Sequence, residues 1–471
     1  MSVTATFQHS TRLAAPFRME HVAAASVLVA CCTALAAAGF GLVWLVIVAT
    51  GIFFIGCVQR PQLAIIMFVG SSFFVQNDLS AGGIPVHLPD VGFLVVLAVF
   101  AIREGHRINL RMVRQPLVLA SLFVVFMGCM AGINGYLSGN SPALIPGDLR
   151  PMLYYVLVWP IASFLPHSRT RYSLVLWLCL FAICGISWGM WQDAMNPDFL
   201  GYSVTIGPVT FGRLVFPLMP TFIPMQIGLL ATVLLVSGTK RNRRVLIITL
   251  VIALVGLFLS LTRAGIVGFA VGIITVNIIA QGHLFPWRKM AVVVLLISCA
   301  GWTLDTTTGH VLSDRLSTTS VSDDNVASRL YEAALVFEKI KEKPIFGSGL
   351  GALHSPDQPL KPDDKTNLSS YLNPTYVHNF YLWTWFKLGI GGLIGFVTLI
   401  IAALITGVCA YRDAQVSCDK RLALAATAIV AATAIASITS PMFNDEFTAP
   451  FTIVMLGLCG AIFTRPTRAI G

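Results

Sequence analysis

The chain has 471 residues, of which 56% are hydrophobic and 11% are charged. An average soluble domain has about 25% charged residues, so this composition excludes an ordinary soluble enzyme and indicates a membrane protein. The net charge of +10 at pH 7 does not indicate nucleic acid as a partner, because the basic residues gather in short loops between apolar runs.

Apolar runs of roughly 17–25 residues, the length that a bilayer core of about 30 Å requires, recur along nearly the whole chain. We therefore expect an all-α polytopic membrane protein with about 12–14 transmembrane helices, surrounded by membrane lipids. The expected spans lie near 22–38, 42–58, 61–76, 89–103, 116–133, 149–166, 172–191, 213–236, 244–261, 264–281, 289–305, 378–411, 421–440 and 447–464. The run 378–411 is too long for one straight span, so we expect it to begin outside the bilayer.

One long polar segment divides these spans into two groups. We expect an N-terminal transmembrane bundle over 1–305, a large external loop over 306–377 and C-terminal transmembrane helices over 378–471. Within the loop, a helix with one apolar stripe is predicted over 328–343. The residues that recur at helical spacing there are Leu330, Ala333, Ala334, Phe337 and Ile340.

Pro344 and the run Gly347–Gly351 follow this predicted helix. The glycine run resembles a phosphate-cradling loop only loosely, because it lacks the Lys-Ser/Thr pair of a nucleotide-binding loop. We therefore interpret Pro344 and the glycines as the stop of the helix.

The distribution of Lys and Arg predicts the orientation, with both ends of the chain on the inside. The basic residues of the internal loops are Arg103, Arg107, Arg111, Arg114, Arg169, Arg171, Lys240, Arg241, Arg243, Arg244, Arg288, Lys289, Lys420 and Arg421. The short external loops hold Arg150, Arg213 and Arg263. Guanidinium groups bind phosphate oxygens in bidentate fashion, so these three arginines indicate an anionic ligand at the outer surface.

Each arginine also has a simpler interpretation, in which its side chain reaches lipid headgroups. Arg150 is the weakest candidate, because Asp148 is close enough in sequence to pair with it. Arg329 and Glu332 are three residues apart on the loop helix. They form either a surface ion pair that contributes little to stability or part of the site facing the membrane.

His378 stands where the large loop returns to the membrane, at the start of an aromatic-rich stretch. Imidazole titrates near neutral pH, so His378 is the candidate general base. The alternative is an interfacial histidine that anchors a helix end beside the aromatic belt. Lys387 follows nine residues later, as either a buried counter-charge or a residue that reaches the interface.

Neither a metal nor a cofactor is predicted. The His, Asp and Glu residues form no cluster with ligand spacing, and the pairs Asp323-Asp324 and Asp363-Asp364 are expected to be solvated. None of the ten cysteines falls in the large external loop, so no disulfide framework is expected.

Four segments, in this order, resemble the O-antigen ligase and polymerase superfamily of bacterial envelope enzymes. They are the stretch around Arg213, Ser260-Leu261-Thr262-Arg263-Ala264-Gly265, the loop helix from Arg329 to Pro344-Ile345-Phe346-Gly347-Ser348-Gly349, and His378-Asn379-Phe380-Tyr381 with Gly389-Ile390-Gly391-Gly392. The motifs cover roughly residues 200–390, and hydropathy alone covers the rest. Lys387 stands where many relatives carry an acid, which leaves its role open.

The resemblance implies a GT-C-like glycosyltransferase in the bacterial inner membrane, with a periplasmic active site and both termini cytoplasmic. Its donor is a glycan linked to undecaprenyl diphosphate. A ligase transfers that glycan to a sugar hydroxyl of the lipid A–core and completes lipopolysaccharide. An O-antigen polymerase or a protein O-oligosaccharyltransferase would share the mechanism, and the single long external loop favours the ligase. A transporter or flippase is less favoured, because no internal repeat is visible.

Such a donor suggests roles for the residues already named. Arg213 and Arg263 would bind the diphosphate in place of a metal and stabilise charge on the leaving group. His378 would accept the proton of the attacking hydroxyl, and a single displacement would invert the anomeric carbon. The catalytic candidates are therefore His378, Arg213 and Arg263, and the substrate-binding candidates are Arg150, Arg329, Glu332, Asn379 and Tyr381.

Overall fold

The computed structural model describes residues 42–74, 79–81, 84–86, 88–104, 110–195, 203–206, 209–212, 222–237, 242–260, 262–281, 324–354, 377–445 and 447–464. Its contacts divide the chain into two units, Met1–Arg60 and Pro61–Gly471. The described part of the first unit holds the helix α2 (Leu42–Gln59), and everything below concerns the second unit.

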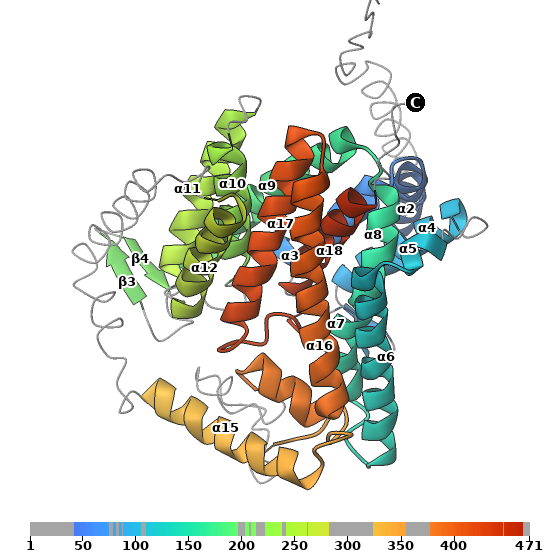
Figure 1. Ribbon diagram of the computed structural model, residues 1–471, viewed down its shortest axis with the longest axis vertical. Coiled ribbons are helices and arrows are strands. Elements are labelled where there is room, and N and C mark those ends of the chain that lie inside the picture. Colours follow the sequence, from blue (N-terminus) through green and yellow to red (C-terminus); the bar gives the residue numbers. More distant parts are fainter. Residues whose placement is uncertain are drawn as a thin grey trace, which may run out of the picture. The chain divides into compact units, whose positions relative to one another are not determined.

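Helices make up most of the second unit, with two short antiparallel hairpins between them (Figure 1). Its first half holds α3 (Pro61–Phe74), α4 (Leu88–Glu104), α5 (Leu110–Val113), α6 (Pro116–Leu137), α7 (Ile145–Leu153), the 3-10 helix η1 (Tyr154–Leu157), α8 (Val158–Phe164) and α9 (Ser168–Met195). Its second half holds α10 (Ile223–Val236), α11 (Arg243–Leu259), α12 (Arg263–Ile279), α15 (Asp324–Glu342), α16 (Phe380–Asp413), α17 (Ser417–Ala436) and α18 (Ala449–Phe463). The hairpins pair β1 (Leu79–Ala81) with β2 (Ile84–Val86) and β3 (Ser203–Ile206) with β4 (Val209–Gly212).

The predicted all-α membrane fold is confirmed. Three of the described helices are long and apolar enough to cross a membrane, namely Pro116–Leu137, Ser168–Trp191 and Phe380–Asp413. Other described helices, several of them shorter and apolar, coincide with further expected spans. The expected spans 22–38 and 289–305 lie outside the described residues, so the total number of spans stays a prediction.

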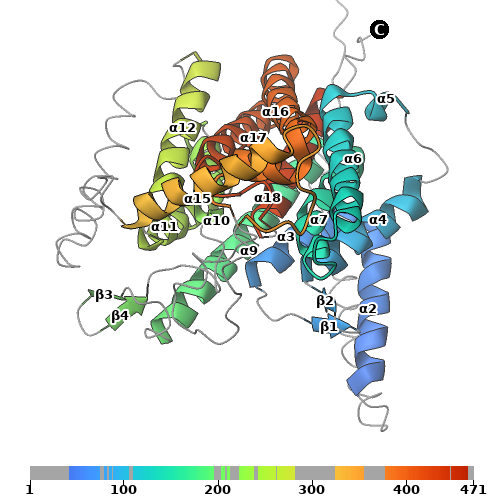
Figure 2. The same cartoon turned by 90° about the horizontal axis from the view of Figure 1, so that it is seen from below.

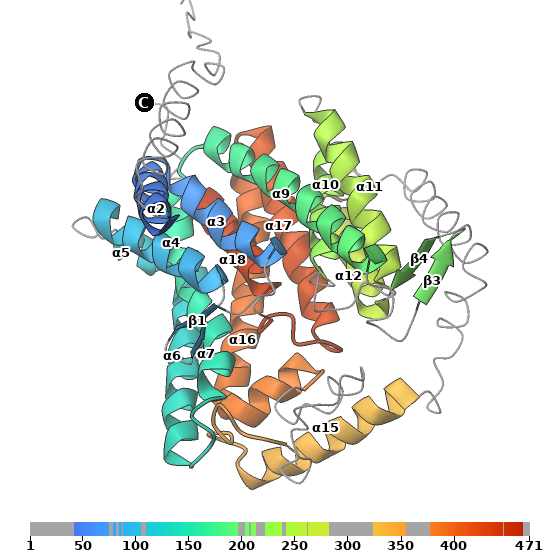
Figure 3. The same ribbon diagram turned by 180° about the vertical axis from the view of Figure 1, so that it is seen from behind.

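The helices α17 and α18 lie at the centre of the unit. Every residue of α18 from Ala449 to Ile462 is buried, and α17 packs against α10, α12, α16 and α18. A Cβ built on Gly268 of α12 would lie 3.1 Å from the carbonyl oxygen of Ala432, so glycine lets α12 and α17 approach closely. The helices α3 and α9 cover the face seen in Figure 3, and α15 crosses one end of the bundle in Figure 2.

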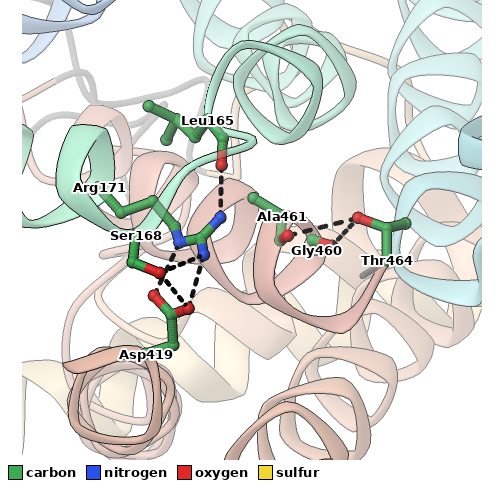
Figure 4. A network of polar contacts seen from close by, with 7 residues as sticks. All are labelled: Leu165, Ser168, Arg171, Asp419, Gly460, Ala461 and Thr464. Carbon is green, nitrogen blue, oxygen red and sulfur yellow. Dashed lines mark hydrogen bonds and ion pairs between the residues drawn. The ribbon is translucent and has the colours of Figure 1, made fainter. Parts of the chain in front are cut away.

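A buried ion pair joins α9 to the first turn of α17. Arg171 donates through Nε to Oδ1 of Asp419 at 3.0 Å and through a terminal nitrogen to Oδ2 at 2.7 Å (Figure 4). Its other terminal nitrogen donates to the carbonyl oxygen of Leu165 at 2.6 Å, and Ser168 Oγ donates to Asp419. Both charged side chains are buried, so Arg171 is a structural residue and not one of the exposed internal charges.

Replacing Asp419 with alanine is expected to destabilise the protein strongly. The guanidinium group of Arg171 would remain buried without its carboxylate, and breaking a buried ion pair costs about 3–5 kcal/mol. The measurement is the midpoint of thermal unfolding of the purified protein in detergent. Asp413→Ala is the matched control, because Asp413 is exposed at the end of α16. Equal midpoints for both variants would contradict a stabilising role of the pair.

Candidate active site

His378 lies just before α16 and is held by Glu332 of α15. Its Nδ1 is 2.7 Å from Oε2 of Glu332, and its backbone N–H donates to Oε1 at 2.6 Å. The two side chains are only 14% and 11% exposed. An ionised carboxylate accepts but does not donate, so the contact places a proton on Nδ1, and in the neutral imidazole the lone pair is then on Nε2.

The face of α15 that meets the bundle carries Glu332, Val336 and Ile340, spaced one helical turn apart. The apolar stripe named from the sequence shares only Ile340 with this buried face, and its residues Leu330, Ala334 and Phe337 are exposed. Burying a carboxylate is costly unless it is hydrogen-bonded. The two bonds to His378 meet that condition and turn Glu332, instead of Leu330, towards the protein.

The first turn of α16 is fixed by its cap and by α17. Asn379 Oδ1 accepts the backbone N–H groups of Tyr381 at 2.9 Å and Leu382 at 3.0 Å, which are otherwise unpaired at a helix start. The N–H of Phe380 donates to the carbonyl oxygen of Ser437 at 3.0 Å, and Tyr381 Oη donates to that of Ala434 at 2.8 Å. Asn379 and Tyr381 therefore hold His378 in place, and contact of these two with substrate stays a prediction.

The helix α16 bends at Gly389, whose φ of 71° and ψ of −173° are not helical. A Cβ there would overlap the carbonyl oxygen of Ile345, so the bend requires glycine. The loop after α15 pairs with the backbone groups that the bend releases. The N–H of Ser348 donates to the carbonyl oxygen of Phe386 at 2.7 Å, and the N–H of Gly349 donates to that of Lys387 at 3.0 Å. In the other direction, the N–H of Ile390 donates to the carbonyl oxygen of Pro344 at 3.1 Å.

The helix α15 ends at Glu342, so Pro344 and the glycine run Gly347–Gly351 follow its end, as the sequence predicts. The three glycines of the run have φ values of 70°, 84° and 74°, which favour glycine. Every backbone N–H of the run donates to another part of the protein, to acceptors in Lys343, Phe386, Lys387, Ala131 and Asp148. The N–H groups that would cradle a phosphate are therefore already bonded.

The same loop is bound to the end of α6. Asn134 Nδ2 donates to the carbonyl oxygen of Gly347 at 3.2 Å, and Asn140 Nδ2 donates to those of Ser348 and Leu350, both at 2.9 Å. A Cβ on Gly135 would overlap the carbonyl oxygen of Leu350. The loop thus ties the end of α15 to α6 on one side and to the bend of α16 on the other.

Lys387 is a buried counter-charge, which answers the question left open by the sequence. Its Nζ lies 2.5 Å from Oδ2 of Asp148 on α7, and its side chain is fully buried. The same oxygen accepts the N–H of Gly351 at 2.7 Å. Asp148 therefore joins α7, the glycine run and the part of α16 that follows His378.

Arg150 pairs with Asp90, and the suggested pair with Asp148 is wrong. Its Nε lies 3.2 Å from Oδ2 of Asp90, and Tyr154 Oη donates to the other oxygen at 2.6 Å. Asp148 faces Lys387 instead, because that ammonium group is fully buried and needs a carboxylate. Binding of substrate by Arg150 stays a prediction.

Arg263 lies at the same end of the bundle as His378. Arg263 is the first residue of α12 and is partly exposed. Gly268, one turn further, packs on Ala432 near the end of α17, and Ser437 beyond that end binds Phe380. Arg263 and His378 therefore lie at the same end of the unit.

Arg329 is exposed on α15, one turn before Glu332. Glu332 faces His378, so the predicted surface pair with Arg329 does not describe its contacts. Arg213 lies outside the described residues. The predicted roles of Arg329 and Arg213 stay predictions.

The loop between α17 and α18 contributes a partly buried carboxyl group, that of Asp445, at this end of the unit. Asp445 accepts the N–H of Thr448 at 3.0 Å and is also bonded to the Thr448 hydroxyl. Burial raises the pKa of Asp445, and the bonds to Thr448 oppose that shift. The contacts make Asp445 a cap for the start of α18.

In the described part of the chain, no three His, Cys, Asp or Glu residues are grouped to hold a metal.

A comparison with protein families bears on the same segments. A family model described as O-antigen ligase matches residues 248–397, which include Arg263, Glu332 and His378. No curated protein matches the chain. The family implies a glycosyltransferase or ligase-type enzyme with a lipid-linked glycan donor and a lipid acceptor in the membrane. The match over these residues supports the resemblance of the chain to the O-antigen ligase superfamily.

Proposed function

We propose that this protein is an O-antigen ligase of the bacterial inner membrane. It would transfer a glycan from undecaprenyl diphosphate to a sugar hydroxyl of the lipid A–core on the periplasmic face. The observation that carries the proposal is the His378–Glu332 pair, which lies within the matched domain and at the same end of the unit as Arg263. A histidine oriented by a carboxylate is suited to take a proton from an alcohol.

The reaction is a single displacement at the anomeric carbon. Nε2 of His378 accepts the proton of the acceptor hydroxyl while its oxygen forms the new bond to that carbon. The bond from the carbon to the donor phosphate breaks, and its electron pair leaves with undecaprenyl diphosphate. Attack opposite the leaving group gives an inverted linkage.

The arginines are assigned to the leaving group. Arg263 and Arg213 bind the diphosphate oxygens and stabilise the charge that develops as the glycosidic bond breaks. Because guanidinium stays charged at any physiological pH, these residues would supply the positive charge that other transferases take from a metal. Arg150 and Arg329 are proposed to contact more distant parts of the substrates.

Glu332 acts in this scheme as a positioning residue. Its carboxylate fixes the ring of His378 and stabilises the imidazolium cation that forms when Nε2 takes the proton. It also holds the backbone N–H of His378, which sets the distance of the ring from the first turn of α16.

Replacing Glu332 with glutamine is expected to lower kcat roughly 10- to 100-fold, less than loss of the base itself. The amide keeps the shape of the side chain but cannot stabilise the imidazolium, so the acid limb of the pH–rate profile should move to lower pH. A merely structural role would leave the shape of that profile unchanged. The control is Glu338→Gln, whose exposed side chain pairs with Lys341 on the same helix.

The function is tested with purified protein, undecaprenyl-diphosphate glycan and rough lipopolysaccharide, with and without EDTA. We expect a ladder of glycan-bearing lipopolysaccharide that EDTA does not weaken. Longer glycans on undecaprenyl diphosphate without the ladder would show a polymerase. No turnover of the donor would overturn both assignments.

A further inference from the structure

The part of α16 after its bend presents one apolar face to the outside. The exposed residues recur every three or four positions, as one face of a helix requires: Ile390, Ile394, Val397, Ile401 and Ile405. Since α16 is long and apolar enough to cross a membrane, this stripe faces lipid. Its first member, Ile390, follows the bend at Gly389 directly.

The helix α6, which packs beside α16 (Figure 1), has a stripe of the same kind. Its exposed apolar residues are Leu119, Phe123, Phe126, Met130, Ile133 and Leu137. This stripe continues to the last turn of the helix, where Leu137 is 77% exposed. The lipid-facing surface of α6 therefore reaches the level at which the loop after α15 is bound.

The turn Pro344-Ile345-Phe346 lies where these two stripes end. The carbonyl oxygen of Pro344 accepts the N–H of Ile390, and that of Phe346 accepts Asn134 Nδ2 at 3.4 Å. Asn134 stands next to Ile133 in the stripe of α6. The backbone of the turn is thus anchored to both lipid-facing helices.

The side chains of this turn point away from the protein. Ile345 is 63% exposed and Phe346 is 78% exposed, although both are large and apolar. Trp385 donates its Nε1 hydrogen to Pro344 at 3.0 Å, and tryptophan is typical of the membrane–water interface. An exposed apolar pair, continuous with two lipid-facing stripes and beside an interfacial tryptophan, indicates contact with the bilayer.

We propose that Ile345 and Phe346 form a wedge that inserts into the bilayer leaflet on the side of α15. The occupant of this surface is bilayer lipid, in contact through its acyl chains with the two side chains. The wedge fixes the end of α15 at the membrane surface, about three turns from Glu332 along the helix. The depth of the His378–Glu332 pair relative to the lipid is then set by the wedge, whichever reaction the site performs.

The proposal is tested by replacing Phe346 with the photoreactive p-benzoyl-phenylalanine. The full-length protein is reconstituted into nanodiscs of phosphatidylcholine and phosphatidylglycerol without any glycan donor, irradiated, and examined by mass spectrometry for lipid adducts. Ile394 is the positive control within the stripe of α16, and Glu338 is the control on the exposed polar surface of α15.

We expect a yield of lipid adducts at Phe346 close to that at Ile394 and several-fold above that at Glu338. The same label at Ile345 should give the same order. A yield at Phe346 no higher than at Glu338, or adducts with protein alone, would overturn the proposal. Because no donor is present and no turnover is measured, this outcome is independent of whether the protein is a ligase.

Discussion

Replacing His378 with alanine is expected to slow glycan transfer by about 10²- to 10⁴-fold, the contribution of a positioned general base. Without Nε2, the acceptor hydroxyl would have to attack while keeping its proton, which makes it a poor nucleophile. The measurement is the initial rate of formation of glycan-bearing lipopolysaccharide from undecaprenyl-diphosphate glycan at saturating acceptor.

The alanine variant also leaves Glu332 without its partner, so a second variant separates chemistry from folding. In His378→Asn the side-chain amide can donate to Glu332 in place of Nδ1–H but cannot act as a base. We expect it to retain the thermal midpoint of the unmodified protein and to be as inactive as His378→Ala. The control is His167→Ala, because His167 is exposed before α9. Substantial transfer by His378→Asn would remove His378 from the role of base.

Replacing Arg263 with alanine is expected to lower kcat by about 10²- to 10³-fold, the cost of removing one group that stabilises transition-state charge. The loss should fall on kcat more than on KM for the donor, because negative charge builds on the diphosphate as the bond breaks. Arg263→Lys should recover only part of the rate, since an ammonium group keeps the charge but lacks the planar fork.

The matched control for Arg263 is Arg244→Ala. Arg244 is exposed near the start of α11, and Arg263 follows the opposite end of that helix. Both variants are assayed with EDTA present, so that no adventitious cation replaces the lost charge. An unchanged kcat in Arg263→Ala would exclude this residue from stabilising the leaving group.

The features that could be predicted from the sequence are those with local signals. Hydropathy over single spans predicted helices at α6, α9 and α16. Where the start of α16 lies relative to the bilayer stays a prediction. Proline and glycine predicted the end of α15, which the structure places at Glu342. Each of these signals lies within the segment that it describes.

The partners within the candidate site could not be predicted, because tertiary packing chooses them. Glu332 is 46 residues from His378, and Asp148 is 239 residues from Lys387. Sequence proximity suggested Arg329 for Glu332 and Arg150 for Asp148 instead, and both suggestions failed. Asp148 and Arg150 are two residues apart and do not face each other on a helix. Glu332 turns to His378 although Arg329 lies only one turn before it on α15. The sequence also misled at Arg171. Its place in an internal loop suggested an exposed basic residue, but its side chain is buried in an ion pair with Asp419.

The bond from Phe380 to the carbonyl oxygen of Ser437 bears on how the protein is made. Ser437 is synthesised after α17, so the start of α16 acquires its anchor only when α17 has left the ribosome and reached the membrane. The loop after α15, by contrast, finds part of its partners in α6 and α7, among segments synthesised before it. During biogenesis, the end of α15 can therefore dock on α6 and α7 before the first turn of α16 is anchored, and the candidate site is completed by one of the last helices translated. A nascent chain that stalls before Ser437 would carry both His378 and Glu332 and still lack an anchored site.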